Sequence, residues 1–189
     1  MTETTQSDRH SIYQLKIWLK GSEPPILRRI QVDSHITLYK LQRILQIVMG
    51  WTNTHLHEFI INGTHYGQSH PEYGLEFKTE RRARLDDLMP EENTHFIYEY
   101  NLDDQWLHDI EIEKILPPES GVHYPRCIGG DRACPPEECG GIRGYADLLE
   151  IIQNPEDPDY QQTIEWLGED FDPEAFDIDE VNRELKQIR

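Results

Sequence analysis

The sequence predicts an α+β fold in which one main helix covers a mixed β-sheet and a helical extension follows. Three observations favour this class. Two alternating segments precede a single amphipathic helical segment, further alternating segments follow it, and apolar stripes at helical spacing return only after residue 144. One helix packed on one face of a sheet would bury all of these apolar stripes.

The N-terminal third predicts a hairpin followed by the main helix. Residues 13–20 alternate strictly between polar and apolar side chains, which is typical of a half-buried strand. Turn residues at 21–25 separate this strand from a second one at 26–32. Thr37 can cap the helix that follows, in which apolar residues recur at helical spacing as far as Val48, and Gly50 can end it.

The middle of the chain predicts further strands. Residues 59–61 begin a strand, and Asn62-Gly63 is a strong signal for a tight turn back toward residue 66. Residues 67–80 have the composition of a loop. Residues 84–89 are expected to form a helical turn. Residues 95–100 and 106–115 alternate again. A hairpin, one crossing helix and then further strands is the element order of the β-grasp (ubiquitin-like) architecture, which is therefore the expected sheet.

The C-terminal third has a different character. Residues 119–144 are rich in Gly, Pro and Cys and show no periodicity, and three short helical patterns follow, beginning near residues 145, 160 and 178. Helices this short are not stable alone, so we expect them to pack on the sheet. The expected organisation is a disordered tail at 1–10, a β-grasp-like domain at 11–117, and an extension at 118–189 that forms one structural unit with it.

The charge pattern bears on partners and location. The formal net charge is −18, and residues 144–182 hold thirteen Asp and Glu with no Lys or Arg. Such a chain would repel a phosphate backbone, although basic residues gather at Arg28-Arg29 and at 78–84. No stretch approaches about 18 apolar residues, so no membrane span is expected. Three cysteines without an export signal favour a reducing compartment, the cytoplasm.

Two histidines and three cysteines suggest a metal site. Because side chains alternate along a strand, His57 and His108 are both expected to point to the apolar side. Thiolate and imidazole ligands together suit zinc. Of the two gaps between the cysteines, six and four residues long, only the second matches a structural zinc site. The predicted zinc ligands are His57, His108, Cys127, Cys134 and Cys139.

Structural alternatives stay open at each of these positions. A buried histidine can bond to a backbone carbonyl or to a carboxylate such as Asp104, and for either histidine alone this interpretation is favoured. The cysteines can be buried thiols or, less favoured in the cytoplasm, can include a Cys127–Cys134 disulfide. The Pro- and Gly-rich loop around them either presents a ligand site or simply connects sheet to helix. The expected ligand-binding residues are Asp104, Trp106, Arg126 and Arg132.

A set of short motifs is distributed over nearly the whole chain. They are Arg28-Arg29-Ile30, Thr37-Leu38, Met49-Gly50-Trp51, His55-Leu56-His57-Glu58-Phe59, Trp106 with His108, Tyr124-Pro125-Arg126-Cys127, Ala133-Cys134-Pro135-Pro136-Glu137, Gly140-Gly141, Gly144-Tyr145, and Trp166-Leu167 with Phe171-Asp172-Pro173. Together these motifs resemble the plasmid pRiA-type ORF-three-like family, whose members are also labelled insertion-element passenger proteins. The resemblance runs from about residue 13 to about residue 185 and implies an association with mobile elements, without an established activity. The family usually has Tyr-Asp-Phe-Gly-Asp before its Trp and His, whereas residues 100–104 read Tyr-Asn-Leu-Asp-Asp here.

Three functions are compatible with these features of the sequence. The leading expectation is a cytoplasmic binding or adaptor module that acts by contact with another protein, by analogy with other β-grasp scaffolds. The second is a metal- or thiol-dependent enzyme built from His57, His108, Asp104 and the cysteines. The third, disfavoured by the charge, is a nucleic-acid-binding accessory protein that uses the two basic patches.

Overall fold

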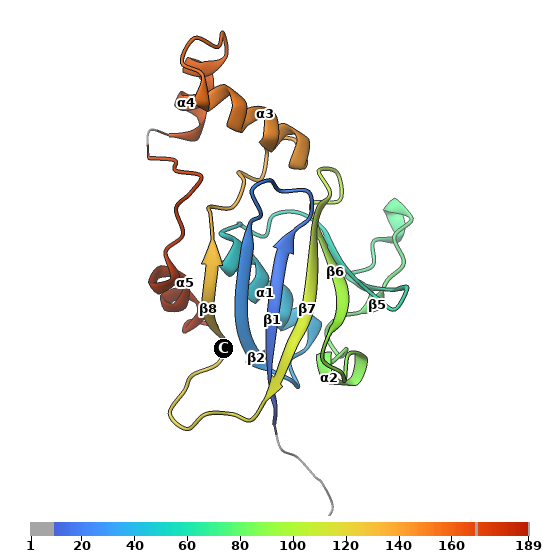
Figure 1. The fold of residues 1–189 in the computed structure, drawn as a ribbon. Coiled ribbons are helices and arrows are strands. Elements are labelled where there is room, and N and C mark those ends of the chain that lie inside the picture. Colours follow the sequence, from blue (N-terminus) through green and yellow to red (C-terminus); the bar gives the residue numbers. More distant parts are fainter. Residues whose placement is uncertain (1–9, 169, 189) are drawn as a thin grey trace, which may run out of the picture.

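The structure, a computed structural model, describes residues 10–168 and 170–188 and contains one eight-stranded mixed sheet within them (Figure 1). The strand order is β5-β4-β3-β6-β7-β1-β2-β8. Neighbouring strands are antiparallel except for the short pair β4 and β5, which is parallel. The strands are β1 (Ile12–Leu19), β2 (Leu27–Asp33), β3 (His57–Ile61), β4 (Thr64–Gly67), β5 (Lys78–Thr79), β6 (Thr94–Tyr100), β7 (Trp106–Leu116) and β8 (Arg126–Asp131).

Five α-helices accompany the sheet in the described ranges. They are α1 (Leu38–Met49), α2 (Leu85–Leu88), α3 (Gly141–Gln153), α4 (Tyr160–Leu167) and α5 (Ile178–Leu185), with one 3₁₀ turn at Pro71–Tyr73. None of them combines the length and the apolar character that a membrane-crossing helix needs. The prediction of a disordered tail at 1–10 falls almost wholly on residues 1–9, which lie outside the described residues.

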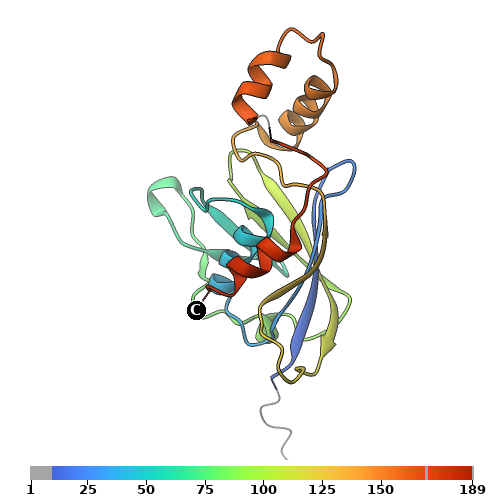
Figure 2. The same ribbon diagram turned by 90° about the vertical axis from the view of Figure 1, so that its left-hand side faces the viewer.

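The expected α+β fold with a β-grasp-like sheet and one main helix is wrong. The eight strands of the sheet do not form a β-grasp. Instead of one main helix, two helices, α1 and α5, lie on the same side of the sheet (Figure 2). Element order does not determine which strands pair. The largest error lies in the segment that lacked periodicity, where β8 forms an edge strand along β2. Gly129 and Gly130 remove the side-chain alternation that would have revealed this strand.

The main helix was predicted correctly. Thr37 caps α1, since its Oγ1 accepts a hydrogen bond from the Lys40 backbone N–H at 3.3 Å. Gly50 ends the helix with φ of 82°, a left-handed conformation that glycine adopts without strain. The apolar face of α1 is buried against the sheet, which places the C-terminal end of this helix beside the ends of β6 and β7.

The three short C-terminal helices are also confirmed, but of the three it is α5 that packs on the sheet as expected. Helix α5 lies against β8 and α1, where the Asn182 side chain bonds the Cys127 backbone N–H at 2.8 Å and the Cys127 carbonyl at 2.9 Å. Helices α3 and α4 instead pair as a hairpin beyond one end of the sheet (Figures 1 and 2). This α3–α4 hairpin (residues 141–168) is connected to the sheet by the loop that contains two of the cysteines.

Candidate functional site

Aromatic side chains at one end of the sheet hold the cysteine-containing loop that follows β8. The Trp51 indole donates a hydrogen bond to the Pro135 carbonyl at 2.9 Å, and the Trp106 indole donates to the Glu137 carbonyl at 3.3 Å. The Trp51 ring stacks on Tyr100 with centroids 5.1 Å apart. Because both indoles are buried and their N–H groups are satisfied by the loop, the loop backbone is anchored at this end of the sheet.

The Glu137 carboxylate is the most heavily hydrogen-bonded group of this loop. It accepts from the Tyr100 hydroxyl at 3.2 Å, from the Thr52 hydroxyl at 3.1 Å and from the Thr54 hydroxyl at 3.3 Å, and also from the Thr52 backbone N–H. These donors come from β6 and from the segment between α1 and β3. Glu137 therefore ties together three parts of the chain that are distant in sequence.

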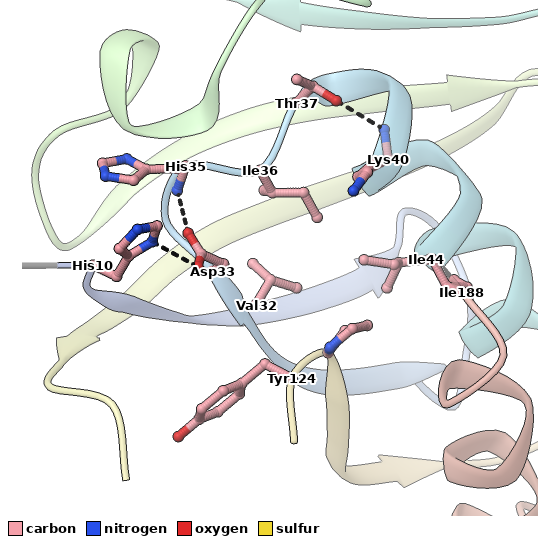
Figure 3. A pocket seen from close by; sticks show the side chains of 11 residues that line it. His10, Val32, Asp33, His35, Ile36, Thr37, Lys40, Ile44, Tyr124 and Ile188 are labelled. Carbon is pink, nitrogen blue, oxygen red and sulfur yellow. Dashed lines mark hydrogen bonds and ion pairs between the residues drawn. The ribbon is translucent and has the colours of Figure 1, made fainter. Parts of the chain in front are cut away.

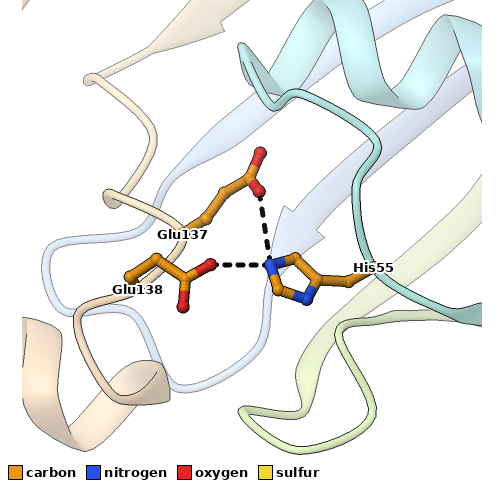
Figure 4. A group of neighbouring side chains, drawn as sticks. All are labelled: His55, Glu137 and Glu138. Carbon is orange, nitrogen blue, oxygen red and sulfur yellow. Dashed lines mark hydrogen bonds and ion pairs between the residues drawn. The ribbon is translucent and has the colours of Figure 1, made fainter.

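His55 brings a third ligand-type side chain to this place (Figure 4). Its Nε2 lies 2.7 Å from Glu138 Oε1 and 3.7 Å from Glu137 Oε2. In the described part of the chain, these three side chains form a group whose candidate metal-ligand atoms all lie within 4.8 Å of one another. One imidazole and two carboxylates are ligands that zinc accepts, and the same arrangement is an ion pair when the imidazole is protonated.

A polar cavity of about 300 Å³ adjoins His55. We call it the histidine pocket. His57 lies in it, with Nε2 2.9 Å from the Oε2 of Glu80, a glutamate only 5% exposed. The pocket is lined by Tyr39, Gln42, Arg43, Asn53, His55, Leu56, His57, Gln68, His70, Glu80 and Arg81.

His108, the other histidine of the predicted zinc site, is a core residue. It is 0% exposed, and its Nδ1 lies 3.1 Å from the Tyr98 carbonyl oxygen. Burial lowers the pKa of His108 to about 4, so the ring is neutral at pH 7. Its Nε2 has no hydrogen-bond partner among the described residues. This environment matches the structural alternative of a core histidine bonded to a backbone carbonyl.

The three cysteines are free thiols in the structure. Desolvation raises the pKa of all three, that of Cys139 to about 12 and that of Cys134 well above the usual value. The nearby Arg28 guanidinium acts in the opposite direction on Cys127 and Cys134 but is the smaller effect. At pH 7 the thiols are therefore protonated, which is unfavourable for a cysteine nucleophile.

The predicted zinc ligands do not gather at one point. His57 lies in the histidine pocket and His108 in the core, while Cys127 is on β8 and the other two cysteines are in the loop beyond it. In the described ranges no three of these five residues have ligand atoms within 4.8 Å of one another. The zinc site at these five residues stays a prediction that metal analysis can test.

The two predicted arginines lie at opposite ends of β8. Arg126 begins the strand and donates to Gln31 Oε1 at 2.7 Å and to Glu119 Oε1 at 3.0 Å. Arg132 follows the strand and pairs with Glu174 Oε1 at 2.9 Å. Since each residue of a strand advances the chain by about 3.3 Å, the two arginines stand roughly 20 Å apart along the edge. They do not form one ligand site.

Asp104 and Trp106 lie closer to the sheet end. The Asp104 carboxylate accepts from the Asn101 side chain at 3.3 Å within the turn between β6 and β7. Trp106 is 1% exposed and anchors the loop through its indole. The Trp106 ring is thus buried next to the loop, and neither of its faces is open to a ligand.

The basic patch at Arg28 and Arg29 is not a free surface. Arg28 is 2% exposed, donates to the Val48 carbonyl at 2.6 Å, and lies 4.1 Å from the centre of the Phe176 ring. Arg29 forms a two-pronged ion pair with Glu113 at 2.8 and 2.9 Å. Both guanidinium groups are therefore occupied within the protein.

Sequence reasoning missed Glu80 and Arg43 in the histidine pocket and placed Arg81 in a basic patch rather than in a cavity. It also did not connect His55 with Glu137 and Glu138. His55 and Glu137 are 82 residues apart, and no local spacing links them. The family-like motif that contains both His55 and His57 was the available signal. It marked the segment but not the partners that the fold brings to it.

A second cavity, of about 360 Å³, lies near the start of α1 and is mainly apolar (Figure 3). Val32, Ile36, Ile44 and Ile188 contribute aliphatic walls. At one side, His10 Nδ1 lies 2.9 Å from the Asp33 carboxylate. The cavity has none of the predicted site residues in its lining, so it is separate from the chemistry at the sheet end.

Comparisons with known proteins agree with this architecture. The family model described as "Plasmid pRiA4b ORF-3-like protein" matches residues 11–180. The uncharacterized protein y4hQ of Sinorhizobium fredii is 33% identical over 180 residues, which cover 94% of this chain and 92% of that protein. The crystal structure of MM3350 from Methanosarcina mazei Go1, a protein of unknown function, superposes with a TM-score of 0.82 at 37% identity and covers 91% of this chain and 98% of that one. The chain therefore belongs to the plasmid pRiA4b ORF-3-like family, as its motifs indicated.

Proposed function

We propose that this protein is a cytoplasmic binding module and that its α3–α4 hairpin contacts a basic segment of another protein. The observation that carries the proposal is Trp166, a large aromatic side chain that is 52% exposed on α4. Exposed tryptophans at the centre of a concave surface are frequent anchors of protein interfaces. The hairpin also stands beyond the end of the sheet, where a partner has access to both helices (Figure 2).

A shallow cavity between the two helices supplies the concave surface. It measures about 380 Å³ and is lined by Leu148 and Ile151 of α3 and by Thr163 and Trp166 of α4. Glu138, Cys139, Gly144 and Asp147 complete the lining. An aliphatic or aromatic side chain of a partner would bury apolar surface here, and that burial is favourable at about 25 cal/mol per Å².

The charge of the hairpin favours a basic partner. Residues 141–168 contain six Asp and Glu and a single basic residue, Arg143. Complementary charge around an apolar anchor accelerates association and rejects acidic competitors. A Lys- and Arg-rich segment that carries one large apolar side chain therefore suits this surface best.

The first prediction concerns Trp166→Ala. We expect this variant to bind a Lys/Arg-rich peptide with one central Phe about 30-fold more weakly than the wild-type chain, because truncation of an interface tryptophan costs about 2 kcal/mol. Fluorescence anisotropy of the labelled peptide measures the change. Tyr73→Ala is the matched control, since Tyr73 is 71% exposed but lies outside the hairpin. Equal affinities of the two variants, or equal binding of a Glu-rich peptide, would refute the proposal.

A second candidate function is metal binding, which the approach of His55, Glu137 and Glu138 favours. Three such ligand atoms can share one divalent cation if the ion replaces the hydrogen bond between His55 and Glu138. Glu137 is already oriented by Tyr100 and two threonines, as metal ligands commonly are by neighbouring groups.

The second prediction concerns the metal content of protein purified without added zinc, which metal analysis measures. We expect zinc to be retained in a Cys134→Ser variant and lost from a His55→Ala variant. The opposite result would assign the metal to the cysteines instead, and the absence of metal from the wild-type chain after equilibration with zinc would exclude both sites. Circular dichroism of each variant checks that the fold is retained.

A further inference from the structure

The histidine pocket concentrates positive and hydrogen-bonding groups in a chain whose formal net charge is −18. Two arginines line it, and each of its three histidines faces a carboxylate, His55 that of Glu138, His57 that of Glu80 and His70 that of Glu72. Its walls come from α1, from the segment between α1 and β3, and from the region around β5. The positive charge that the cavity offers to a ligand therefore comes from its two guanidinium groups.

The Glu80 carboxylate is hydrogen-bonded within the protein. Its carboxylate lies 2.9 Å from His57 Nε2, and its backbone carbonyl accepts the Tyr39 N–H in the first turn of α1 at 3.2 Å. Pairing with Glu80 orients the His57 ring. In the described part of the chain, His57 Nδ1 has no hydrogen bond to the protein.

Two guanidinium groups are the cationic part of the cavity lining. Arg81 lies 4.3 Å from the centre of the Tyr39 ring, an arrangement that leaves the edge of the guanidinium free to donate hydrogen bonds. Among the described residues, neither Arg81 nor Arg43 forms an ion pair with a carboxylate. Arginines without an acidic partner beside a cavity are suited to bind an anion.

We propose that the histidine pocket binds a small molecule that carries a phosphate group. The two guanidinium groups together offer more N–H donors than the two oxygens of one carboxylate can accept, whereas a phosphate presents more oxygens and more charge. The cavity of about 300 Å³ is at the lower end of the range for ligand sites, which limits the occupant to a small molecule. Tyr39, whose ring packs against Arg81, adds an aromatic side chain to the lining.

Isothermal titration calorimetry with inorganic phosphate, pyrophosphate and adenosine 5′-monophosphate at constant, low ionic strength tests this proposal. We expect at least one of these probes to bind, and Arg81→Ala and Arg43→Ala each to weaken its affinity by about ten-fold or more. Arg82→Ala is the matched control, because Arg82 is an exposed neighbour of Arg81 that does not line the cavity. Trp166→Ala should also bind normally, which separates this site from the hairpin surface.

Four outcomes would overturn the proposal. They are the failure of all three probes to bind at millimolar concentration, equal losses in the Arg81 and Arg82 variants, unchanged affinity in both pocket variants, and binding of malonate as tightly as phosphate. Thermal denaturation of each variant without ligand confirms that the exposed substitutions leave the fold intact, so a loss of binding reports on the pocket itself.

Discussion

Trp106→Ala should lower the free energy of unfolding by about 3–5 kcal/mol, the range found when a large buried aromatic side chain is removed from a protein core. Trp106 is 1% exposed, and its ring packs 5.7 Å from that of Trp51. The substitution also removes the indole donor to the Glu137 carbonyl, which leaves the loop without one of its anchors. Urea denaturation followed by far-UV circular dichroism measures the change.

Trp18→Ala is the control for this experiment. Trp18 lies on β1 in the same sheet but is half-buried, and its ring contacts Lys16 and His95 rather than the core. We expect a clearly smaller loss of stability from this substitution, since less apolar surface is removed from the protein interior. Equal losses in both variants would contradict the assignment of Trp106 as the support of the loop.

Gly144→Ala should destabilise the start of the α3–α4 hairpin, although alanine is normally the better helix former. A Cβ atom at residue 144 would stand 1.8 Å from the Cys139 carbonyl oxygen, so the backbone of the loop would have to move. Helix propensity favours alanine over glycine by about 1 kcal/mol, whereas overpacking against a rigid neighbour costs roughly 1–3 kcal/mol or more. At a separation this short we expect the clash to dominate.

Limited proteolysis and thermal denaturation together detect this effect. The variant should be cleaved faster than wild type within residues 134–168 and should unfold at a lower temperature. Gly129→Ala serves as the matched control, because a Cβ there would meet only the Arg29 Cβ at 4.0 Å, an ordinary contact. Protection of the hairpin from protease at the wild-type level would show that the loop accommodates the methyl group.

Comparison of His57 with His108 shows how far strand alternation can predict a site. Both were expected on apolar strand faces, yet His108 is a neutral core residue and His57 lies in a polar cavity. What separates them is the partner that each meets, the Tyr98 carbonyl for His108 and Glu80 for His57. Periodicity places a side chain on a face, but the charge of its surroundings depends on segments that approach from elsewhere in the chain.

The cysteines illustrate the same limit. The residue types made zinc a reasonable hypothesis. The spacing of residues in the sequence, however, shows neither the desolvation of the thiols nor the distribution of the five residues over the fold. Arg28 was counted among the basic patches, whereas it is a buried residue that donates to backbone carbonyls. Residue type indicates which functional groups are present, whereas burial decides which of those groups a ligand can contact.

By itself the sequence determined the local elements, since the hairpin of β1 and β2, the capped helix α1 and the three C-terminal helices follow from alternation, helical spacing and capping residues within short windows. Its motifs also determined the family. Only the tertiary structure decided the strand order, the place of β8 at the sheet edge, and the meeting of His55 with Glu137 and of His57 with Glu80. The physical reason is that strand order and these side-chain contacts depend on residues far apart in the chain. The free energy of such contacts comes from burial and pairing of both partners, which local propensity does not describe.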